Sequence, residues 1–131
     1  LSYVIDIEEE CMDYRVPKLT LVTFVENACV HGIENRPGVG WIFLRGRHEK
    51  ENRRIVFEIE DTGNGMEENV CREIQERMNN VNLEMIKEST HIGILNAALR
   101  LKMAEKERVR FTVESEENVG TIVTIVISQR H

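Results

Sequence analysis

Two pairs of alternating segments constrain the fold more than any other feature of this sequence. Residues 40–47 and 53–60 form the first pair, joined by a polar turn at 48–52, and residues 109–115 and 121–128 form the second. In 53–60, Ile55, Phe57 and Ile59 point one way while Val56, Glu58 and Glu60 point the other, which is typical of a strand with one buried and one wetted face. Residues 109–115 and 121–128 alternate in the same manner. The sequence therefore predicts two β-hairpins whose register is set by their apolar faces.

Helical periodicity marks three other segments, residues 18–32, 67–79 and 93–106. Apolar residues recur there three and four positions apart, which is the spacing of one helical face. Pro17 stands before the first of these segments and Gly32 stands at its expected end. The face predicted to be buried in 93–106 consists of Ile94, Leu95, Ala98, Leu99 and Met103. We therefore expect three amphipathic helices.

One more alternating segment, residues 1–7, predicts a fifth strand. Five strands and three helices, joined mostly by hairpin connections, fit an α/β (α+β) fold that is a two-layer sandwich. We expect a mixed, mostly antiparallel sheet with the helices on one face. Because the sequence has no repeat, low-complexity tract or interdomain linker, residues 1–131 are expected to form a single domain.

Composition narrows the classes of function. Of 131 residues, 41% are hydrophobic and 31% are charged, which is typical of a globular domain. The net charge of −6 argues against broad binding to nucleic acid or to an anionic membrane. The three cysteines form no C-x-x-C pair, which indicates reduced thiols in the cytoplasm rather than structural zinc. No apolar run reaches the roughly 18 residues of a membrane span, and the first residue is Leu, so we expect a cytoplasmic fragment of a longer protein.

The polar edge of the segment 18–32 carries residues that can act on a ligand. At about 100° per residue, Thr23, Glu26, Asn27 and His31 fall within roughly 140° of one another. The amide oxygen of Asn27 can complete the shell of a magnesium ion that phosphates also hold. The carboxylate of Glu26 can orient or deprotonate a nucleophile. An ordinary helix edge that meets water fits the same residues.

The segment D-T-G-N-G-M, from Asp61 to Met66, ends the strand predicted at 53–60. A carboxylate at a strand end can accept a hydrogen bond from an exocyclic amine. Gly63 and Gly65 let the backbone approach a flat ligand without Cβ clashes. A plain turn explains the same residues.

The segment T-H-I-G-I-L-N, residues 90–96, opens the helix predicted at 93–106. A helix that begins near a glycine offers free amide groups and a positive dipole end, which suit a phosphate group. An ordinary helix cap by Ser89 or Thr90 fits the same residues.

The order and spacing of these segments carry more information than any one of them. The chain contains E-N-x-x-x-H-G, then D-x-G-x-G-M after a strand, then G-I-L-N at a helix start, then V-G-T-I-V in the last hairpin. In this order it resembles the ATP-binding domain of sensor histidine kinases of the LytS/YesM type, in the superfamily shared with gyrase-type and mismatch-repair ATPases. Its P-K-L-T-L-V-T-F-V-E-N-A-C-V-H-G is similar to that family's P-x-L-x-L-Q-P-L-V-E-N-A-x-x-H-G, and the likeness covers nearly the whole chain. The resemblance implies a Bergerat-type ATP-binding fold.

The resemblance also implies a role for each candidate residue. Asn27 would help to hold Mg²⁺, and Glu26 would act as the polarising acid at the γ-phosphate. Asp61 would bind the adenine amine, and Thr121 would support the base through its hydroxyl group or a water. Gly93 and the helix after it would lie against the phosphates. The full set of implied ATP contacts is Asn27, His31, Asp61, Gly63, Gly65, Met66, Gly93, Ile94, Asn96 and Thr121.

The function implied by the resemblance is that of the catalytic ATP-binding domain of a two-component sensor histidine kinase. It would bind Mg-ATP under a lid formed by residues 66–92 and transfer the γ-phosphoryl group to a histidine on a separate dimerisation segment. A response regulator would act downstream, and the parent protein could be anchored in a membrane. His91 stands where the family often has glycine. No histidine of this sequence has the sequence surroundings of the family's phosphoacceptor histidine, so we expect a catalytic fragment that lacks the phosphoacceptor. The alternative is a nucleotide-binding regulatory or protein-interaction module of the same fold without phosphotransfer.

Overall fold

The computed structural model describes residues 2–8, 40–82 and 92–129. The predicted helix at 18–32 lies outside the described residues. The predicted site residues Glu26, Asn27 and His31 lie outside them, as do Thr23, Ser89, Thr90 and His91.

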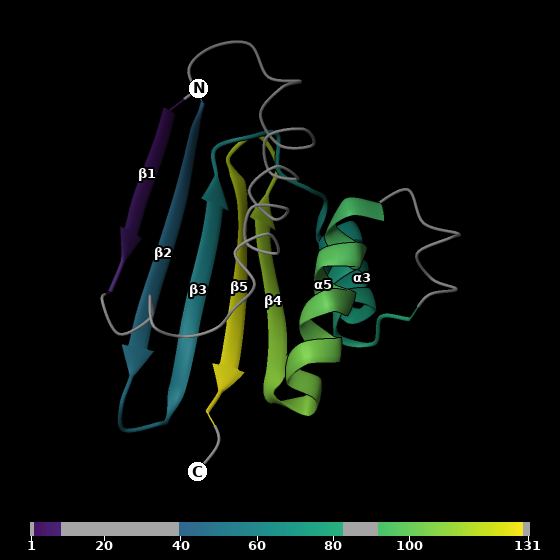
Figure 1. Cartoon of the computed structure of the whole chain (residues 1–131). Helices are drawn as coiled ribbons and strands as arrows, with labels where there is room; N and C mark the ends of the chain where they lie inside the picture. Colours follow the sequence, from purple (N-terminus) through teal and green to yellow (C-terminus); the bar gives the residue numbers. More distant parts are fainter. Residues whose placement is uncertain (1, 9–39, 83–91, 130–131) are drawn as a thin grey trace.

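Five strands of the described residues are β1 (Ser2–Ile7), β2 (Trp41–Glu49), β3 (Arg54–Asp61), β4 (Val109–Glu116) and β5 (Gly120–Ser128). They form one sheet in the order β1-β2-β3-β5-β4, as Figure 1 shows. β1 is parallel to β2, and the other neighbouring pairs are antiparallel, so the predicted mixed, mostly antiparallel sheet is confirmed. The predicted turn at 48–52 begins too early, because His48 and Glu49 still pair with Ile55 and Arg54 of β3.

Two helices of the described residues, α3 (Glu68–Asn79) and α5 (Ile92–Glu105), share one hydrophobic core with the sheet. A short 3₁₀ helix, η2 (Lys106–Arg108), follows α5 and leads into β4. Both α-helices lie near β4 in Figure 1, on one side of the sheet. The helices predicted at 67–79 and 93–106 are confirmed, and so is the two-layer arrangement.

Side chains of β3, β5 and β4 meet in rows across the sheet, and these rows form the core. Residues that pair across neighbouring strands point to the same face, so the strand register defines each row. Three successive rows are apolar and buried: Ile59–Val123–Val113, Phe57–Ile125–Phe111 and Ile55–Ile127–Val109. The helices cover them with Ile74 and Met78 of α3 and with Leu95, Ala98 and Leu101 of α5. Burial of apolar surface, worth roughly 25 cal/mol per Å², is the main stabilising contribution here.

Helix α3 also covers the outer edge of the sheet, where β4 has no further strand beside it among the described elements. Asn79 donates to the Phe111 carbonyl oxygen at 2.8 Å and accepts from the Phe111 N–H at 2.9 Å. Gln75 accepts from the Val113 N–H at 2.8 Å, and the Cys71 thiol donates to the Val113 carbonyl oxygen at 3.2 Å. Four helical residues rise about 6 Å and two strand residues about 6.6–6.8 Å, so one side chain per turn reaches alternate strand residues. These bonds close this stretch of the edge to pairing with another chain.

One predicted core residue is wrong. Met103, expected on the buried face of the helix predicted at 93–106, is 72% exposed. The buried stripe of α5 instead continues through Ala98, Leu101 and Glu105, at intervals of three and four residues, so Met103 falls on the opposite side. Glu105 is buried because its carboxylate pairs with Arg108 at 2.8 Å, within the turn that ends the helix.

The face of the sheet away from the helices carries paired charges. Arg45 pairs with Glu60 at 2.8 Å and lies 5.1 Å from the centroid of the Phe43 ring. Phe43 stacks on Trp41 with a centroid separation of 5.9 Å. Two further ion pairs join Arg47 to Glu58 and Arg54 to Glu49. The arginines Arg45, Arg47 and Arg54 of β2 and β3 are therefore balanced by carboxylates on the same face.

Candidate functional site

A polar row follows the three apolar rows at one end of the sheet. Asp61 is the last residue of β3, Thr121 is its partner on β5, and Ser115 is the partner of Thr121 on β4. Because side chains alternate along a strand, all three lie on the face that the helices cover. We call Asp61, Thr121 and Ser115 the polar row. The sheet thus places one carboxylate and two hydroxyl groups where its apolar core ends.

Asp61 is a buried carboxylate at the start of the D-T-G-N-G loop. The residue is only 7% exposed, and its Oδ1 accepts a hydrogen bond from the Gly63 N–H at 2.9 Å. Burial raises the pKa of Asp61 above its ordinary value, and the backbone N–H groups of Gly63 and Thr121 oppose that rise without cancelling it. A carboxylate has about four acceptor sites, so these backbone donors leave acceptor capacity for a ligand.

Two glycines bring the D-T-G-N-G loop against the turn between β4 and β5. Gly65 has a φ of +69°, and a Cβ atom there would lie 2.0 Å from the carbonyl oxygen of Glu116. Gly120 has a φ of +150°, and a Cβ atom there would lie 2.0 Å from the carbonyl oxygen of Asp61. A side chain at either position would force the loop and the turn apart. The D-T-G-N-G loop is therefore built into the body of the protein rather than being a free surface turn.

Ser115 was not among the predicted site residues, yet it ties the polar row to the loop. Its hydroxyl oxygen accepts from the Met66 N–H at 2.7 Å, lies 2.8 Å from the Thr121 hydroxyl oxygen and donates to the Gly120 carbonyl oxygen at 3.0 Å. The sequence did contain a signal for this residue. In the segment 109–115, Ser115 is the one polar residue in the alternating positions that face the core.

The structure brings together the predicted residues of the base pocket. Asp61, Gly63 and Gly65 follow one another along the loop, and Thr121 lies opposite Asp61 in the sheet. Met66 is partly buried against the core, so its side chain helps to seat the loop. The contact of these residues with a nucleotide stays a prediction.

Three predicted phosphate contacts lie near the start of α5. Gly93, Ile94 and Asn96 all fall within its first turns, and the N–H groups of Gly93 and Ile94 are among the first four of the helix, which lack helical partners. The side chain of Ile94 is buried in the core, so only its backbone can face a phosphate group. Asn96 is partly exposed.

The predicted lid over residues 66–92 is wrong for its first half. Ile74 and Met78 of α3 are 4% and 0% exposed, and other side chains of this helix bond to the edge of β4. A helix held in this way belongs to the body of the domain, because its removal would uncover the core. The lid prediction is therefore restricted to the residues that follow α3, of which 83–91 lie outside the described residues.

The described residues contain neither a metal cluster nor a membrane helix. Across 2–8, 40–82 and 92–129, no three His, Cys, Asp or Glu side chains gather closely enough to hold a metal ion. None of the helices in these ranges has both the length and the apolar character to cross a bilayer. The predicted magnesium ligand, Asn27, lies outside them.

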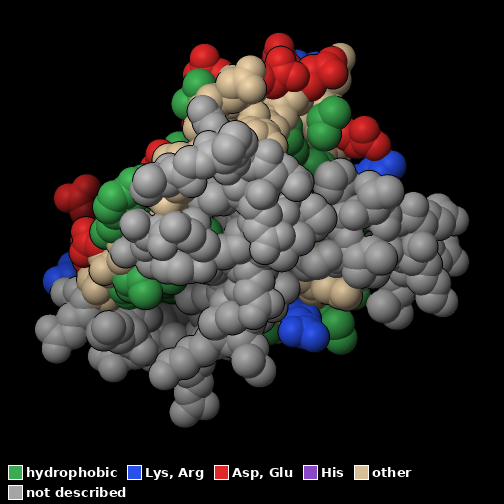
Figure 2. All heavy atoms as spheres, turned by 90° about the horizontal axis from the view of Figure 1, so that it is seen from above, with side chains coloured by type: hydrophobic (Ala, Val, Ile, Leu, Met, Phe, Trp, Pro, Cys, Tyr) green, Lys and Arg blue, Asp and Glu red, His purple; other side chains and the backbone are tan. Residues whose placement is uncertain are grey.

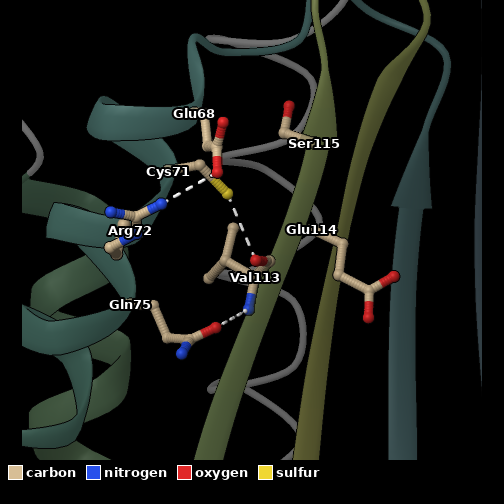
Figure 3. Close-up of a pocket in the computed structure, with 7 residues that line it drawn as sticks. All are labelled: Glu68, Cys71, Arg72, Gln75, Val113, Glu114 and Ser115. Atoms are coloured by element: carbon tan, nitrogen blue, oxygen red, sulfur yellow. Dashed lines mark hydrogen bonds and ion pairs between the residues drawn. The ribbon is translucent and has the colours of Figure 1, made fainter.

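A cavity of about 340 Å³ lies between α3 and β4, beside the polar row (Figure 3). Its lining includes Ser115 but neither Asp61 nor Thr121, so it is not the predicted base pocket. Two charged residues of its lining pair with each other, since Arg72 bonds to Glu68 at 2.8 Å.

The thiol of Cys71 forms part of the cavity wall. Burial raises the pKa of this thiol above its ordinary value, and the carboxylates of Glu114 and Glu68 add to the rise. The thiol is therefore protonated at neutral pH, as its bond to the Val113 carbonyl oxygen requires. In Figure 3 Glu114 points to the other side of β4, away from the cavity.

The charged groups of the described surface are mainly acidic on the face seen in Figure 2. Asp and Glu side chains gather at one end of that view, with few Lys or Arg side chains among them. This agrees with the net charge of −6. The described residues of that face form no broad basic patch of the kind that binding to nucleic acid requires.

Comparison with known proteins gives this geometry a family. The sequence matches the family described as "Histidine kinase-, DNA gyrase B-, and HSP90-like ATPase" over residues 13–131. The sensor histidine kinase YesM of Bacillus subtilis (strain 168) is 26% identical over 100% of this chain, which spans 20% of YesM. The sensor protein LytS of Bacillus anthracis is 30% identical over 126 residues, which are 95% of this chain and 20% of LytS. The chain thus corresponds to a small part of each of these relatives.

Solved structures share the fold at low sequence identity. The kinase domain of the blue-light activated histidine kinase of Erythrobacter litoralis EL346 has a TM-score of 0.63 and 20% identity, over 96% of this chain and 50% of that one. Full-length ShkA in complex with AMPPNP has a TM-score of 0.62 and 18% identity, over 96% of this chain and 25% of ShkA. ThkA in complex with the response regulator TrrA has a TM-score of 0.61 and 19% identity, over 98% of this chain and 34% of that one. The expected fold is confirmed, and the match over residues 13–131 identifies the chain as a member of the family of histidine kinase-, DNA gyrase B- and HSP90-like ATPases.

Proposed function

We propose that this chain is the catalytic ATP-binding domain of a two-component sensor histidine kinase. In this proposal it binds Mg-ATP and transfers the γ-phosphoryl group to a histidine on a separate dimerisation segment of its parent protein. The polar row carries the proposal, because a buried carboxylate beside a hydroxyl group at a strand end suits the exocyclic amine of adenine. The family match and the AMPPNP bound to ShkA support it.

The base end of the pocket is formed by the polar row and the loop that follows β3. Asp61 accepts a hydrogen bond from the 6-amino group of adenine, and Thr121 supports the base through its hydroxyl group or a water. Gly63 and Gly65 allow the flat base to lie close to the backbone. Met66 holds this loop in place through its packing against the core.

The phosphate end is formed by the start of α5 and by the predicted helix at 18–32. The N–H groups of Gly93 and Ile94 and the side chain of Asn96 face the phosphates. Asn27 holds Mg²⁺ and His31 lies beside the nucleotide, as the resemblance implies. A magnesium ion held by phosphates needs only one or two protein oxygens, and the Asn27 amide oxygen would supply one. The ion would supply neutralisation of phosphate charge.

Phosphoryl transfer requires little covalent chemistry from the residues of this chain. A ring nitrogen of the accepting histidine attacks the γ-phosphorus, the bond to the β–γ bridging oxygen breaks, and ADP leaves. Glu26 polarises the accepting imidazole, and the remaining contribution is positioning and charge neutralisation. The complex of ThkA with TrrA supports a response regulator as the next acceptor. Since ATP is a cytoplasmic substrate, we place the domain, residues 1–131, in the cytoplasm.

Calorimetric titration tests the binding half of the proposal. ATP is added to the wild-type protein, to Asp61→Asn and to Asp6→Asn, each with and without magnesium. Asp6 lies on the exposed strand β1, so it serves as the matched control for the loss of one carboxylate. We expect Asp61→Asn to weaken ATP binding at least about tenfold and the control to bind as the wild type does. Equal binding by all three proteins would contradict the adenine assignment.

The alternative function is nucleotide binding without phosphotransfer, in a regulatory or protein-interaction module. The presence of His91 where relatives of this type often carry glycine favours keeping this alternative. A phosphotransfer assay separates the two functions. The chain is mixed with labelled ATP and a dimerisation segment from a sensor kinase of this type. Transfer of label to the segment supports the kinase, and tight ATP binding with no transfer supports the alternative.

A further inference from the structure

The hydrogen-bond donors and acceptors around Ser115 determine which way the Thr121 hydroxyl group is oriented. Ser115 has one hydroxyl proton and two lone pairs, and three groups lie within bonding distance of its oxygen. The Met66 N–H can only donate to it, at 2.7 Å, and the Gly120 carbonyl oxygen can only accept from it, at 3.0 Å. The third group, the Thr121 hydroxyl, must then supply its own proton at 2.8 Å. With these three bonds Ser115 uses its single proton and both of its lone pairs.

The consequence for Thr121 is that its proton is committed to Ser115. Its oxygen then presents only lone pairs to a ligand, next to the carboxylate of Asp61 in the same row. Both members of the row that can meet a base are therefore hydrogen-bond acceptors. A 6-amino group on a purine donates to such a pair, whereas a 6-oxo group, which is an acceptor, does not.

We infer that Ser115 is a positioning residue that selects 6-amino purine nucleotides over 6-oxo purine nucleotides by fixing Thr121 as a hydrogen-bond acceptor. This inference rests on the proposed ATP site and adds to it the residue that sets its choice of base. Ser115 does not need to touch the nucleotide. It acts through the hydroxyl group of Thr121, and its bond to Met66 fixes the loop on which the base would rest.

The test compares ATP with inosine triphosphate, which carries an oxo group in place of the 6-amino group. Dissociation constants for both nucleotides are measured by calorimetry for the wild type and for Ser115→Ala, Ser115→Thr and Thr121→Val. The quantity of interest is the ratio of the two constants in each protein. A merely structural role for Ser115 would weaken both nucleotides alike and leave this ratio unchanged.

We expect the wild type to prefer ATP and Ser115→Ala to reduce that preference about tenfold, because Thr121 can then turn its proton toward a 6-oxo group. Ser115→Thr keeps a hydroxyl group and should retain the wild-type ratio. Thr121→Val lacks the hydroxyl group and should reduce the preference for ATP to a similar extent. In the Thr121→Val background, adding Ser115→Ala should not change the ratio of the two dissociation constants further. The Thr121→Val arm keeps the inference testable if Ser115→Ala does not fold.

Two results would overturn the inference. A wild-type protein that prefers ATP while Ser115→Ala or Thr121→Val keeps the full ratio would remove the inference alone and leave the proposed function standing. A wild-type protein that binds neither nucleotide would remove the proposed function and the inference with it.

Discussion

Gly120 lies so close to Asp61 that a Cβ atom on the glycine would stand 2.0 Å from the carbonyl oxygen of the aspartate. This contact links the turn before β5 to the end of β3. The carboxylate of Asp61 is therefore positioned by backbone packing as well as by its hydrogen bonds.

Gly120→Ala should destabilise the fold by at least about 2 kcal/mol, because it adds both a backbone clash and strain at positive φ. Urea unfolding monitored by circular dichroism measures the effect. Val119→Ala is the matched control, since Val119 is the neighbouring turn residue and is 56% exposed. Equal midpoints for the two variants would contradict the packing described for Gly120.

Asp61→Asn should change how stability depends on pH. Burial raises the folded-state pKa of Asp61, so the folded protein holds this proton more tightly than the unfolded chain does. Stability from this group is therefore present below the unfolded pKa and is lost as the pH rises through the folded pKa. Asparagine removes this dependence, so the variant should gain stability relative to the wild type between acidic and neutral pH.

Urea unfolding of the wild type and Asp61→Asn at several values of pH checks this sign. Asp6→Asn on β1 is the control for the loss of one carboxylate from an exposed position. If Asp61→Asn instead loses stability relative to the wild type as the pH rises, the ionised carboxylate stabilises the fold, contrary to the buried site described here.

Asn79→Ala should destabilise the protein by about 2 kcal/mol, because it leaves both the N–H and the carbonyl group of Phe111 without their α3 partner. Asn80→Ala is the neighbouring control, since the exposed Asn80 side chain bonds to the Glu76 carbonyl oxygen of its own helix rather than to β4. Urea unfolding gives the difference, and sedimentation reports whether the uncovered β4 edge associates. Similar losses in both variants would argue against a special role for the edge contact.

Leu101→Ala should cost about 2–5 kcal/mol because Leu101 is fully buried, whereas Met103→Ala should change stability by less than about 0.5 kcal/mol. Thermal or urea unfolding of both variants distinguishes this arrangement from the one in which Met103 belongs to the core. A large loss of stability in Met103→Ala with little loss in Leu101→Ala would support the prediction from sequence that Met103 lies on the buried face of the helix.

The sequence was sufficient to predict the strands, because apolar side chains recur at every second position along the buried face, as at Ile55, Phe57 and Ile59 of β3. The end of the apolar face of α5 was harder to predict, because Leu101 and Met103 are both apolar and only packing decides which one is buried. The lid prediction failed at α3 because the bonds from Gln75 and Asn79 to β4 join elements that are far apart in sequence.

The candidate site was predictable where single residues carry distinctive chemistry, as Asp61 and the glycines after it do. Ser115 was missed because serine at a strand end is common, and its importance depends on partners in a loop and in a neighbouring strand. The roles of Asn27 and Glu26 remain predictions, since both lie outside the described residues.

The most direct measurement of the central claim is the titration of the ¹⁵N-labelled chain with ATP and magnesium, followed by the backbone amide resonances. If the polar row is the base end of an ATP pocket, the amides of Gly63, Gly65 and Thr121 should shift most among those of the sheet and its loops. Shifts concentrated at Cys71, Gln75 and Val113 around the α3–β4 cavity, with none along the polar row, would contradict it.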